Sequence, residues 1–232
     1  MPKNNYKDLE KQTGIKFKSL ELIKRAFVHK SYVNEHRDED IKDNERLEFL
    51  GDAVLELATT HHLFEGYPDQ DEGQMTAFRS ALVKGKHLAQ VARELKMGDY
   101  LFLSNGEERS GGREKNYILA NVLEALIGAI YMEHGYTVAE KFIEKFILTK
   151  LDEIIEKGLH IDSKSQFQET CQEKEDVTPH YEVLDEEGPD HAKIFTMGAY
   201  IGEELIAKGK GSSKQKAEDE AARNALKAKG WE

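Results

Sequence analysis

The sequence predicts two domains, an all-α domain over residues 1–158 followed by a small α+β domain over residues 159–232. From about residue 6 to residue 157 the apolar residues recur at helical spacing, and almost no alternating strand pattern occurs. A short break follows at residues 158–161. Beyond it the patterns run in the order helix, three strands and helix, which is why we expect a separate α-β-β-β-α domain.

The first element of interest is a helix through residues 44–52, with the sequence NERLEFLGD. Glu45, Glu48 and Asp52 stand at positions i, i+3 and i+7, so the helix places three carboxylates on one face. Apolar residues at helical spacing predict a buried side that holds this face rigid: Leu47, Leu50, Val54 and Leu57. A bound divalent cation would relieve the repulsion between the carboxylates, although a solvated acidic face is the commoner explanation for such a pattern taken alone.

A second helix, predicted over residues 117–132, strengthens the metal interpretation. It carries Asn121 and Glu124 at positions i and i+3. If the two helices pack together, Glu48, Asp52, Asn121 and Glu124 form an all-oxygen site of the kind that Mg²⁺ or Mn²⁺ prefers. Zinc and redox metals are disfavoured, because the chain has one cysteine and neither a His-x-x-x-His nor a Glu-x-x-His pair.

The composition fits a soluble globular protein, with 232 residues, 39% hydrophobic and 33% charged. No apolar stretch reaches membrane length, and the N-terminus lacks the apolar run of a signal peptide, so we expect a cytoplasmic protein with no membrane partner. The lone Cys171 agrees with a reducing compartment. No P-loop pattern occurs, and no nucleotide cofactor is expected.

The net charge of −11 argues against nucleic-acid binding only if the charge is taken as a whole. Residues 207–229 contain seven Lys or Arg against three Asp or Glu. Four of these lysines lie in and just after a glycine-rich loop that precedes a helical pattern at residues 217–228. Lysines together with a helix N-terminus can bind phosphates, although a solubilising capped helix would show the same pattern.

At this point the chain resembles a known family. NERLEFLGD followed by ILANVLEALIGAIY at residues 118–131 resembles the two signature segments of bacterial ribonuclease III. HKSY at 29–32, DEGQ at 71–74 and SGGR at 110–113 resemble further segments of that family. The resemblance implies an endoribonuclease that cleaves double-stranded RNA with metal-activated water. It implies 5′ phosphates, short 3′ overhangs and a role in processing ribosomal, messenger and other structured RNA.

The resemblance also assigns roles in the first domain. Asp52 and Glu124 would be catalytic, and the metal ligands would be Glu48, Asp52, Asn121 and Glu124. Asn121 departs from the family, whose usual residue there is aspartate. The site therefore has one formal negative charge fewer, which predicts weaker Mg²⁺ affinity.

Three further residues receive expectations. Glu45 and Glu72 would belong to a wider acidic valley, although Glu72 is equally well explained as a helix-start carboxylate. Phe49 would fill a socket on a partner subunit, because similar enzymes are homodimers; a core phenylalanine is an equally good interpretation. A glycine inside a helix costs roughly 1 kcal/mol, so Gly51 predicts the close approach of another backbone.

The second domain resembles the double-stranded RNA-binding domain. Its helix is expected at residues 163–173 and its strands at 180–184, 192–200 and 203–208. The recognition loops would be GPDH at 188–191 and SSKQKAE at 212–218. The implied RNA-binding residues, which read duplex shape rather than sequence, are Gln168, Glu169, His191, Lys214 and Lys216. Gln215 stands where a basic residue is usual, which predicts one phosphate contact fewer.

Two functions remain open from the sequence. The first is a Mg²⁺-dependent endonuclease for double-stranded RNA. The alternative is a catalytically impaired protein that binds or protects duplexes without cutting them. Asn121 favours the alternative, whereas the presence of Glu45, Glu48, Asp52 and Glu124 together favours the enzyme. The sequence does not identify the RNA substrates.

Overall fold

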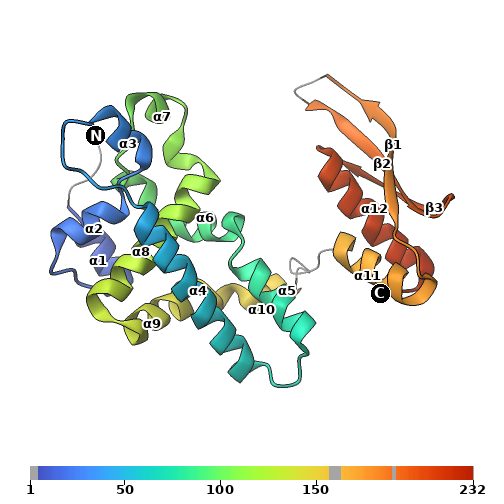
Figure 1. Cartoon of the computed structure of the whole chain (residues 1–232), viewed down its shortest axis with the longest axis horizontal. Helices are drawn as coiled ribbons and strands as arrows, with labels where there is room; N and C mark the ends of the chain where they lie inside the picture. Colours follow the sequence, from blue (N-terminus) through green and yellow to red (C-terminus); the bar gives the residue numbers. More distant parts are fainter. Residues whose placement is uncertain (1–4, 157–162, 190–191, 232) are drawn as a thin grey trace. The chain divides into compact units, whose positions relative to one another are not determined.

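The structure is a computed structural model that describes residues 5–156, 163–189 and 192–231. Contacts along the chain divide it into two compact units, Met1–His160 and Ile161–Glu232. The predicted boundary after residue 158 lies within residues 157–162, outside the described residues. Each unit is described by itself below (Figure 1).

The first unit is built from helices and short 3-10 turns, and an isolated bridge between Val28 and Phe102 is the strand-like pairing seen in its described part. The predicted all-α fold is confirmed. Its elements are α1 (Lys7–Thr13), α2 (Leu20–Ala26), α3 (Lys30–Glu35), α4 (Glu45–Gly66), α5 (Glu72–Leu82), α6 (Gly85–Glu94), η1 (Met97–Tyr100), α7 (Asn105–Arg109), η2 (Gly112–Glu114), α8 (Asn116–His134), α9 (Tyr136–Phe146), η3 (Leu148–Lys150) and α10 (Leu151–Glu156).

Helix α8 forms the centre of this unit, and α4 packs along it (Figure 1). From Ile118 to Ile130 every residue of α8 is buried except Asn121 and Glu124, which are partly exposed. Nearly continuous apolar character is typical of a helix surrounded by other helices. Two polar residues in such a helix must face an opening in the core or a polar neighbour.

Two glycines let the backbones of α4 and α8 approach closely. A Cβ atom on Gly51 would collide with the backbone carbonyl of Glu124, and a Cβ atom on Gly128 would collide with that of Leu47. The close approach predicted from Gly51 is therefore confirmed, and its partner is α8. Because each glycine lies against the helix that holds the other, the register of α4 against α8 is fixed.

The second unit has the predicted order α-β-β-β-α. Its elements are α11 (Ser163–Glu175), β1 (His180–Glu187), β2 (Ile194–Ile201), β3 (Glu204–Gly211) and α12 (Lys214–Lys229). The strands pair antiparallel in the order β1-β2-β3. Both helices pack on one face of the sheet around a core that includes Phe167, Cys171, Met197 and Leu226 (Figure 1).

The structure differs from the sequence prediction at several element ends, and two of the differences have a clear local cause. Strand β1 continues to Glu187 instead of ending at residue 184, because a bulge between Val183 and Asp185 keeps the strand paired with β2. Helix α12 begins at Lys214 instead of residue 217, since the side chain of Ser213 accepts the backbone N–H of Lys216 and caps the helix. Among the described residues, none of the helices combines the length and apolarity needed to cross a membrane.

Candidate active site

The packing of α4 against α8 brings together carboxylates that are far apart in the sequence. Glu48 and Glu124 are partly buried, and Asp52 is exposed one turn beyond Glu48. Burial, together with the nearby charges of Asp52 and Glu48, raises the pKa of Glu124 to about 7. The two predicted segments therefore converge, and their acidic groups lie within electrostatic reach of one another.

Asn121 makes a direct contact with this group. Its amide donates a hydrogen bond to the Glu48 carboxylate. Burial raises the pKa of Glu48, the Asn121 hydrogen bond opposes the rise, and the charges of Glu45 and Asp52 add to it. The amide nitrogen of Asn121 is thus engaged with Glu48, while its carbonyl oxygen can still accept a donor or ligate a cation.

A pocket of about 420 Å³ opens beside these residues. It is lined by His29, Lys30, Ser31, Asn34, Asn44, Glu45, Glu48 and Asn121. Across it Lys30 Nζ lies 2.8 Å from Glu45 Oε1. The pocket therefore unites three of the predicted residues, whereas Asp52 and Glu124 are not part of its lining.

The donor set has the chemistry of a hard divalent cation, because it consists of carboxylate and amide oxygens. No group of three or more His, Cys, Asp and Glu side chains placed to hold a metal ion is found within the described residues. Burial is the largest cause of the raised pKa of Glu124, and repulsion from the carboxylates of Asp52 and Glu48 adds to it. The residues thus fit a cation in the chemistry of their donor atoms, while the described side chains are not gathered closely enough to form a complete metal site.

Glu72 lies apart from the pocket lining. It is exposed as the first residue of α5, directly after Asp71, whose side chain and that of Gln74 form a capping box. A carboxylate in the first turn of a helix interacts favourably with the helix dipole and so stabilises the helix. The position of Glu72 is compatible with both interpretations, a helix-start carboxylate and a residue of a wider acidic surface.

Phe49 projects from α4 into solvent with 81% of its surface exposed. The alternative of a core phenylalanine is excluded by this exposure. Leu57 and Phe64 of the same helix are also exposed, by 57% and 71%, so the prediction that Leu57 is buried was wrong. The helix therefore has a buried side against α8 and, over at least part of its length, an exposed apolar stripe formed by Phe49, Leu57 and Phe64.

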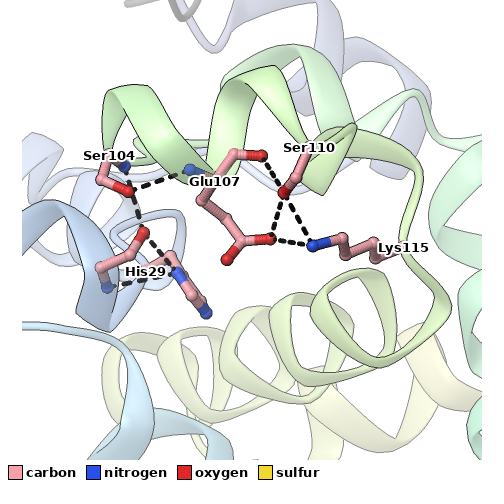
Figure 2. Close-up of polar contacts among 6 residues, drawn as sticks. His29, Ser104, Glu107, Ser110 and Lys115 are labelled. Atoms are coloured by element: carbon pink, nitrogen blue, oxygen red, sulfur yellow. Dashed lines mark hydrogen bonds and ion pairs between the residues drawn. The ribbon is translucent and has the colours of Figure 1, made fainter.

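A polar network surrounds His29, a residue with no predicted role (Figure 2). His29 precedes α3, and its ring accepts the backbone N–H of Ser31. The network continues through Ser104 and Glu107 to Lys115, the residue before α8. Two of the segments quoted for the family resemblance, HKSY at 29–32 and SGGR at 110–113, contribute residues to this network. Nothing in either segment indicated that the two lie close together in the fold.

The second unit exposes Gln168 and Glu169 on α11, where they line a shallow pocket with Gln172 and Glu173. His191 lies outside the described residues. Two predicted residues, Lys214 and Lys216, are exposed in the first turn of α12.

A carboxylate that was not predicted from the sequence lies beside these lysines. Lys214 Nζ lies 3.6 Å from a carboxylate oxygen of Glu186, and Lys193 Nζ lies 3.0 Å from the other oxygen of the same carboxylate. Lys216 Nζ contacts Ser212 Oγ at 3.1 Å. The basic surface therefore includes an acidic group from β1.

Comparisons with known proteins agree with both units. A family model described as Ribonuclease-III-like matches residues 19–151, and one described as Double-stranded RNA binding motif matches residues 163–229. A protein named Ribonuclease 3 from Listeria monocytogenes serotype 4b is 43% identical over 226 residues, covering 96% of this chain and 97% of the relative. A protein of the same name from Myxococcus xanthus is 40% identical, covering 97% of this chain and 86% of the relative.

Among solved structures, the nuclease domain of Ribonuclease III from Campylobacter jejuni matches with a TM-score of 0.58 and 39% sequence identity. The match covers 62% of this chain and 97% of that chain. That structure is described as showing flexibility in a region involved in dimer formation.

Proposed function

The chain belongs to the ribonuclease III family, and from this premise we propose that it is an endoribonuclease that cleaves double-stranded RNA. The observation that carries the proposal is the glycine-mediated packing of α4 on α8, which brings the carboxylates of Glu48, Asp52 and Glu124 within electrostatic reach of one another. A duplex-binding unit on the same chain supplies the substrate class. The alternative, a protein that binds duplexes without cutting, gains nothing from the relatives, which are named as ribonucleases.

The cofactor of this proposal is Mg²⁺, with Mn²⁺ as a substitute, and its ligands are Glu48, Asp52, Asn121 and Glu124. Such an ion, when bound, activates water for attack on the phosphodiester and stabilises the leaving oxygen. The residues of the chain itself hold the proposed ligands in position. Gly51 and Gly128 hold the two helices in register, and Asn121 orients Glu48 through its hydrogen bond. Asp52 and Glu124 are the proposed catalytic residues, and Glu45 and Glu72 the wider acidic surface.

The exposed apolar stripe of α4 supports a homodimer. We assign Phe49, Leu57 and Phe64 to the interface, because an exposed apolar stripe of this kind marks an interaction site. Two symmetric subunits would place one site on each RNA strand, so the products would carry 5′ phosphates and short 3′ overhangs.

The proposed dimer can be tested by introducing one charged side chain into the proposed interface. We expect Phe49→Asp to convert the dimer to a monomer in sedimentation velocity, because a buried unpaired charge is costly. Val183→Asp, which replaces an exposed apolar residue of β1 in the other unit, serves as the control and should leave the dimer intact. A wild-type protein that sediments as a monomer would refute the dimer, and an unchanged Phe49 variant would remove this residue from the interface.

Duplex binding is assigned to the second unit through Gln168, Glu169, His191, Lys214 and Lys216, which would read the A-form shape rather than the sequence. The family relationship supports a cytoplasmic enzyme that processes precursors of ribosomal and messenger RNA. The lysines of α12 stand at a helix start, where backbone N–H groups also favour phosphate.

The decisive experiment is cleavage of a long RNA duplex in Mg²⁺ by wild type and by Glu124→Gln. We expect the variant to lose at least about 100-fold in cleavage rate, because it removes a charge at the reacting site, while it binds the duplex as well as wild type. Glu144→Gln, on an exposed position of α9, removes one charge from the same unit and should cleave normally. If wild type binds duplexes but cuts them in neither Mg²⁺ nor Mn²⁺, the impaired alternative is correct.

A further inference from the structure

The pocket beside the acidic residues has two chemically different sides. Helix α3 and the residue before it contribute hydrogen-bond donors, namely His29, Lys30 and Asn34, whereas α4 and α8 contribute Glu45, Glu48 and Asn121. A phosphodiester group bound together with a cation requires both of these kinds of group. The cation requires acidic oxygens, and the remaining phosphate oxygens require donors.

The hydrogen bonds of His29 determine which of its nitrogens can donate. Nδ1 accepts the backbone N–H of Ser31 at 3.2 Å and lies 2.8 Å from Ser31 Oγ. Ser31 Oγ itself accepts the backbone N–H of Ser104 at 3.1 Å, so the Ser31 hydroxyl hydrogen is available for Nδ1. Because Nδ1 serves only as an acceptor, the proton of the neutral ring is on Nε2.

The surroundings favour this neutral form. Burial lowers the pKa of His29 below its ordinary value, while the charges of Glu107, Glu45 and Asp43 oppose that effect and Lys115 adds to it. A neutral donor has an advantage in this pocket. A cationic side chain would pair with the acidic side, as Lys30 does with Glu45, whereas a neutral imidazole leaves the carboxylates free.

The network in Figure 2 ties His29 to the helix that carries Asn121 and Glu124. Ser104 accepts the backbone N–H of Glu107 at 3.1 Å, and the Glu107 carboxylate lies 2.5 Å from Lys115 Nζ. Lys115 is the N-cap residue of α8. The imidazole is therefore fixed by contacts that reach the start of α8.

The other edge of the ring is free to meet a ligand. In Figure 2 Nε2 of His29 points away from the bonded edge, and no partner for it is seen in the described part of the chain. His29 lines the same pocket as Glu45 and Glu48. We propose that His29 Nε2–H donates a hydrogen bond to a non-bridging phosphate oxygen of the RNA strand that is cut, which makes it an RNA-contacting residue of the active site. This inference rests on the proposed function.

Two substitutions separate the two edges of the ring. His29→Asn places a carbonyl oxygen near the position of Nδ1, so it keeps the acceptor for Ser31 and loses the donor. His29→Gln places an amide N–H near the position of Nε2, so it keeps the donor and loses the acceptor. We expect His29→Asn to lower kcat/KM on a long duplex by about 10- to 100-fold with an unchanged unfolding temperature. His29→Gln should retain most of the cleavage and unfold at a lower temperature.

Duplex binding in EDTA supplies a readout that does not depend on cleavage. His29→Asn should bind more weakly than wild type by about 3- to 10-fold, because one hydrogen bond to phosphate is lost. His36→Asn is the matched control, since His36 stands at the end of α3 and is not part of the pocket lining. It should bind and cleave as wild type does.

The outcomes are distinguishable. If His29→Asn binds and cleaves like wild type, or if His29→Gln loses as much cleavage as His29→Asn, the proposed phosphate contact is wrong and His29 is only a helix cap. If wild type does not cut the duplex at all, the proposed function fails, and the binding measurements in EDTA still decide the role of His29.

Discussion

The two units of the chain use glycine in the same way but place their functional groups differently. In the first unit Gly51 and Gly128 bring α4 against α8, and the partly buried Glu48 and Glu124 lie at that contact. In the second unit Gly209 packs against the backbone of α12, yet the lysines at the start of that helix are exposed. The acidic site thus depends on backbone packing, whereas the basic surface depends on long side chains and their ion pairs. A substitution at the helix contact of the first unit should therefore cause a large loss of activity, whereas a substitution in the basic surface of the second unit should change duplex binding only slightly.

The largest expected effect comes from Gly51→Ala. Because the added methyl group would collide with the carbonyl of Glu124, α4 must move away from α8. We expect the first unit to lose at least about 3 kcal/mol of unfolding free energy and its cleavage activity. Urea unfolding and a cleavage assay measure both effects, while duplex binding by the second unit should persist.

Gly66→Ala is the matched control for this experiment. Gly66 is the last residue of the same helix, and a Cβ atom there would have open space around it. Its stability should change by less than about 1 kcal/mol, because only the intrinsic helix preference changes. If Gly51→Ala were as stable and active as Gly66→Ala, the site would not depend on close helix packing.

A second test uses pH to measure how far burial, together with the acidic neighbours on α4, raises the pKa of Glu124. The pKa of Glu124 is about 7 in the folded protein, above the ordinary value of 4.5, so the folded state binds this proton more tightly than the unfolded state. Stability from the protonated carboxyl is therefore full below about pH 4.5 and is lost as the pH rises to 7. In EDTA, wild type should lose about 1–2 kcal/mol relative to Glu124→Gln between pH 5 and pH 7.5, after allowance for solvent screening. A constant difference between the two proteins across this range would show that neither burial nor the neighbouring carboxylates raise the pKa of Glu124.

A third test restores the charge that Asn121 lacks. Asn121→Asp should lower the Mg²⁺ concentration for half-maximal cleavage by about fivefold, because the added carboxylate attracts the cation. It should also destabilise the metal-free protein by about 1 kcal/mol, since Glu48 loses a hydrogen bond and gains a like charge. Asn116→Asp adds the same charge at the start of the same helix and serves as the control. Position 121 is not a ligand if the two variants need the same Mg²⁺ concentration as wild type.

The sequence was sufficient for those parts of the fold and site that depend on local spacing. Helical spacing predicted α4 and α8, and the cost of a helical glycine predicted the close contact at Gly51. Between Ile118 and Ile130 the residues of α8 are buried except Asn121 and Glu124, which agrees with the two residues singled out from this helix. These inferences succeeded because a helix converts spacing in sequence directly into a face in space.

The remaining features depend on which distant segments meet, and local spacing carries no such information. Leu57 has the spacing of a core residue, but α8 covers the other side of α4 and leaves it exposed. His29 lines the acidic pocket, and its partner Ser31 accepts the backbone N–H of Ser104, which lies 73 residues beyond Ser31 and caps a short helix with no periodic signal. Glu186 meets Lys214 because a bulge extends β1, and neither sequence position indicates a bulge. In each case tertiary contacts, rather than propensity, decided the outcome.

The smallest expected effect belongs to the basic surface. The ion pairs with Lys193 and Lys214 keep the pKa of Glu186 below its ordinary value, the hydrogen bond from Lys193 being the largest cause, so the carboxylate is charged at neutral pH. RNA phosphates must compete with it for Lys214. Glu186→Gln should therefore tighten duplex binding by about two- to threefold at low salt and steepen the salt dependence of log Kd.

The control for this last test is Glu182→Gln, which removes an exposed charge from the same strand beside His180 rather than beside a lysine. A change in net charge alone would strengthen binding equally in both variants, because long-range attraction to RNA depends on the total field. A larger effect at Glu186 would mean that the freed lysines themselves gain phosphate contacts. Since such contacts form between exposed side chains, the gain should disappear at high salt, whereas the loss caused by Gly51→Ala should not.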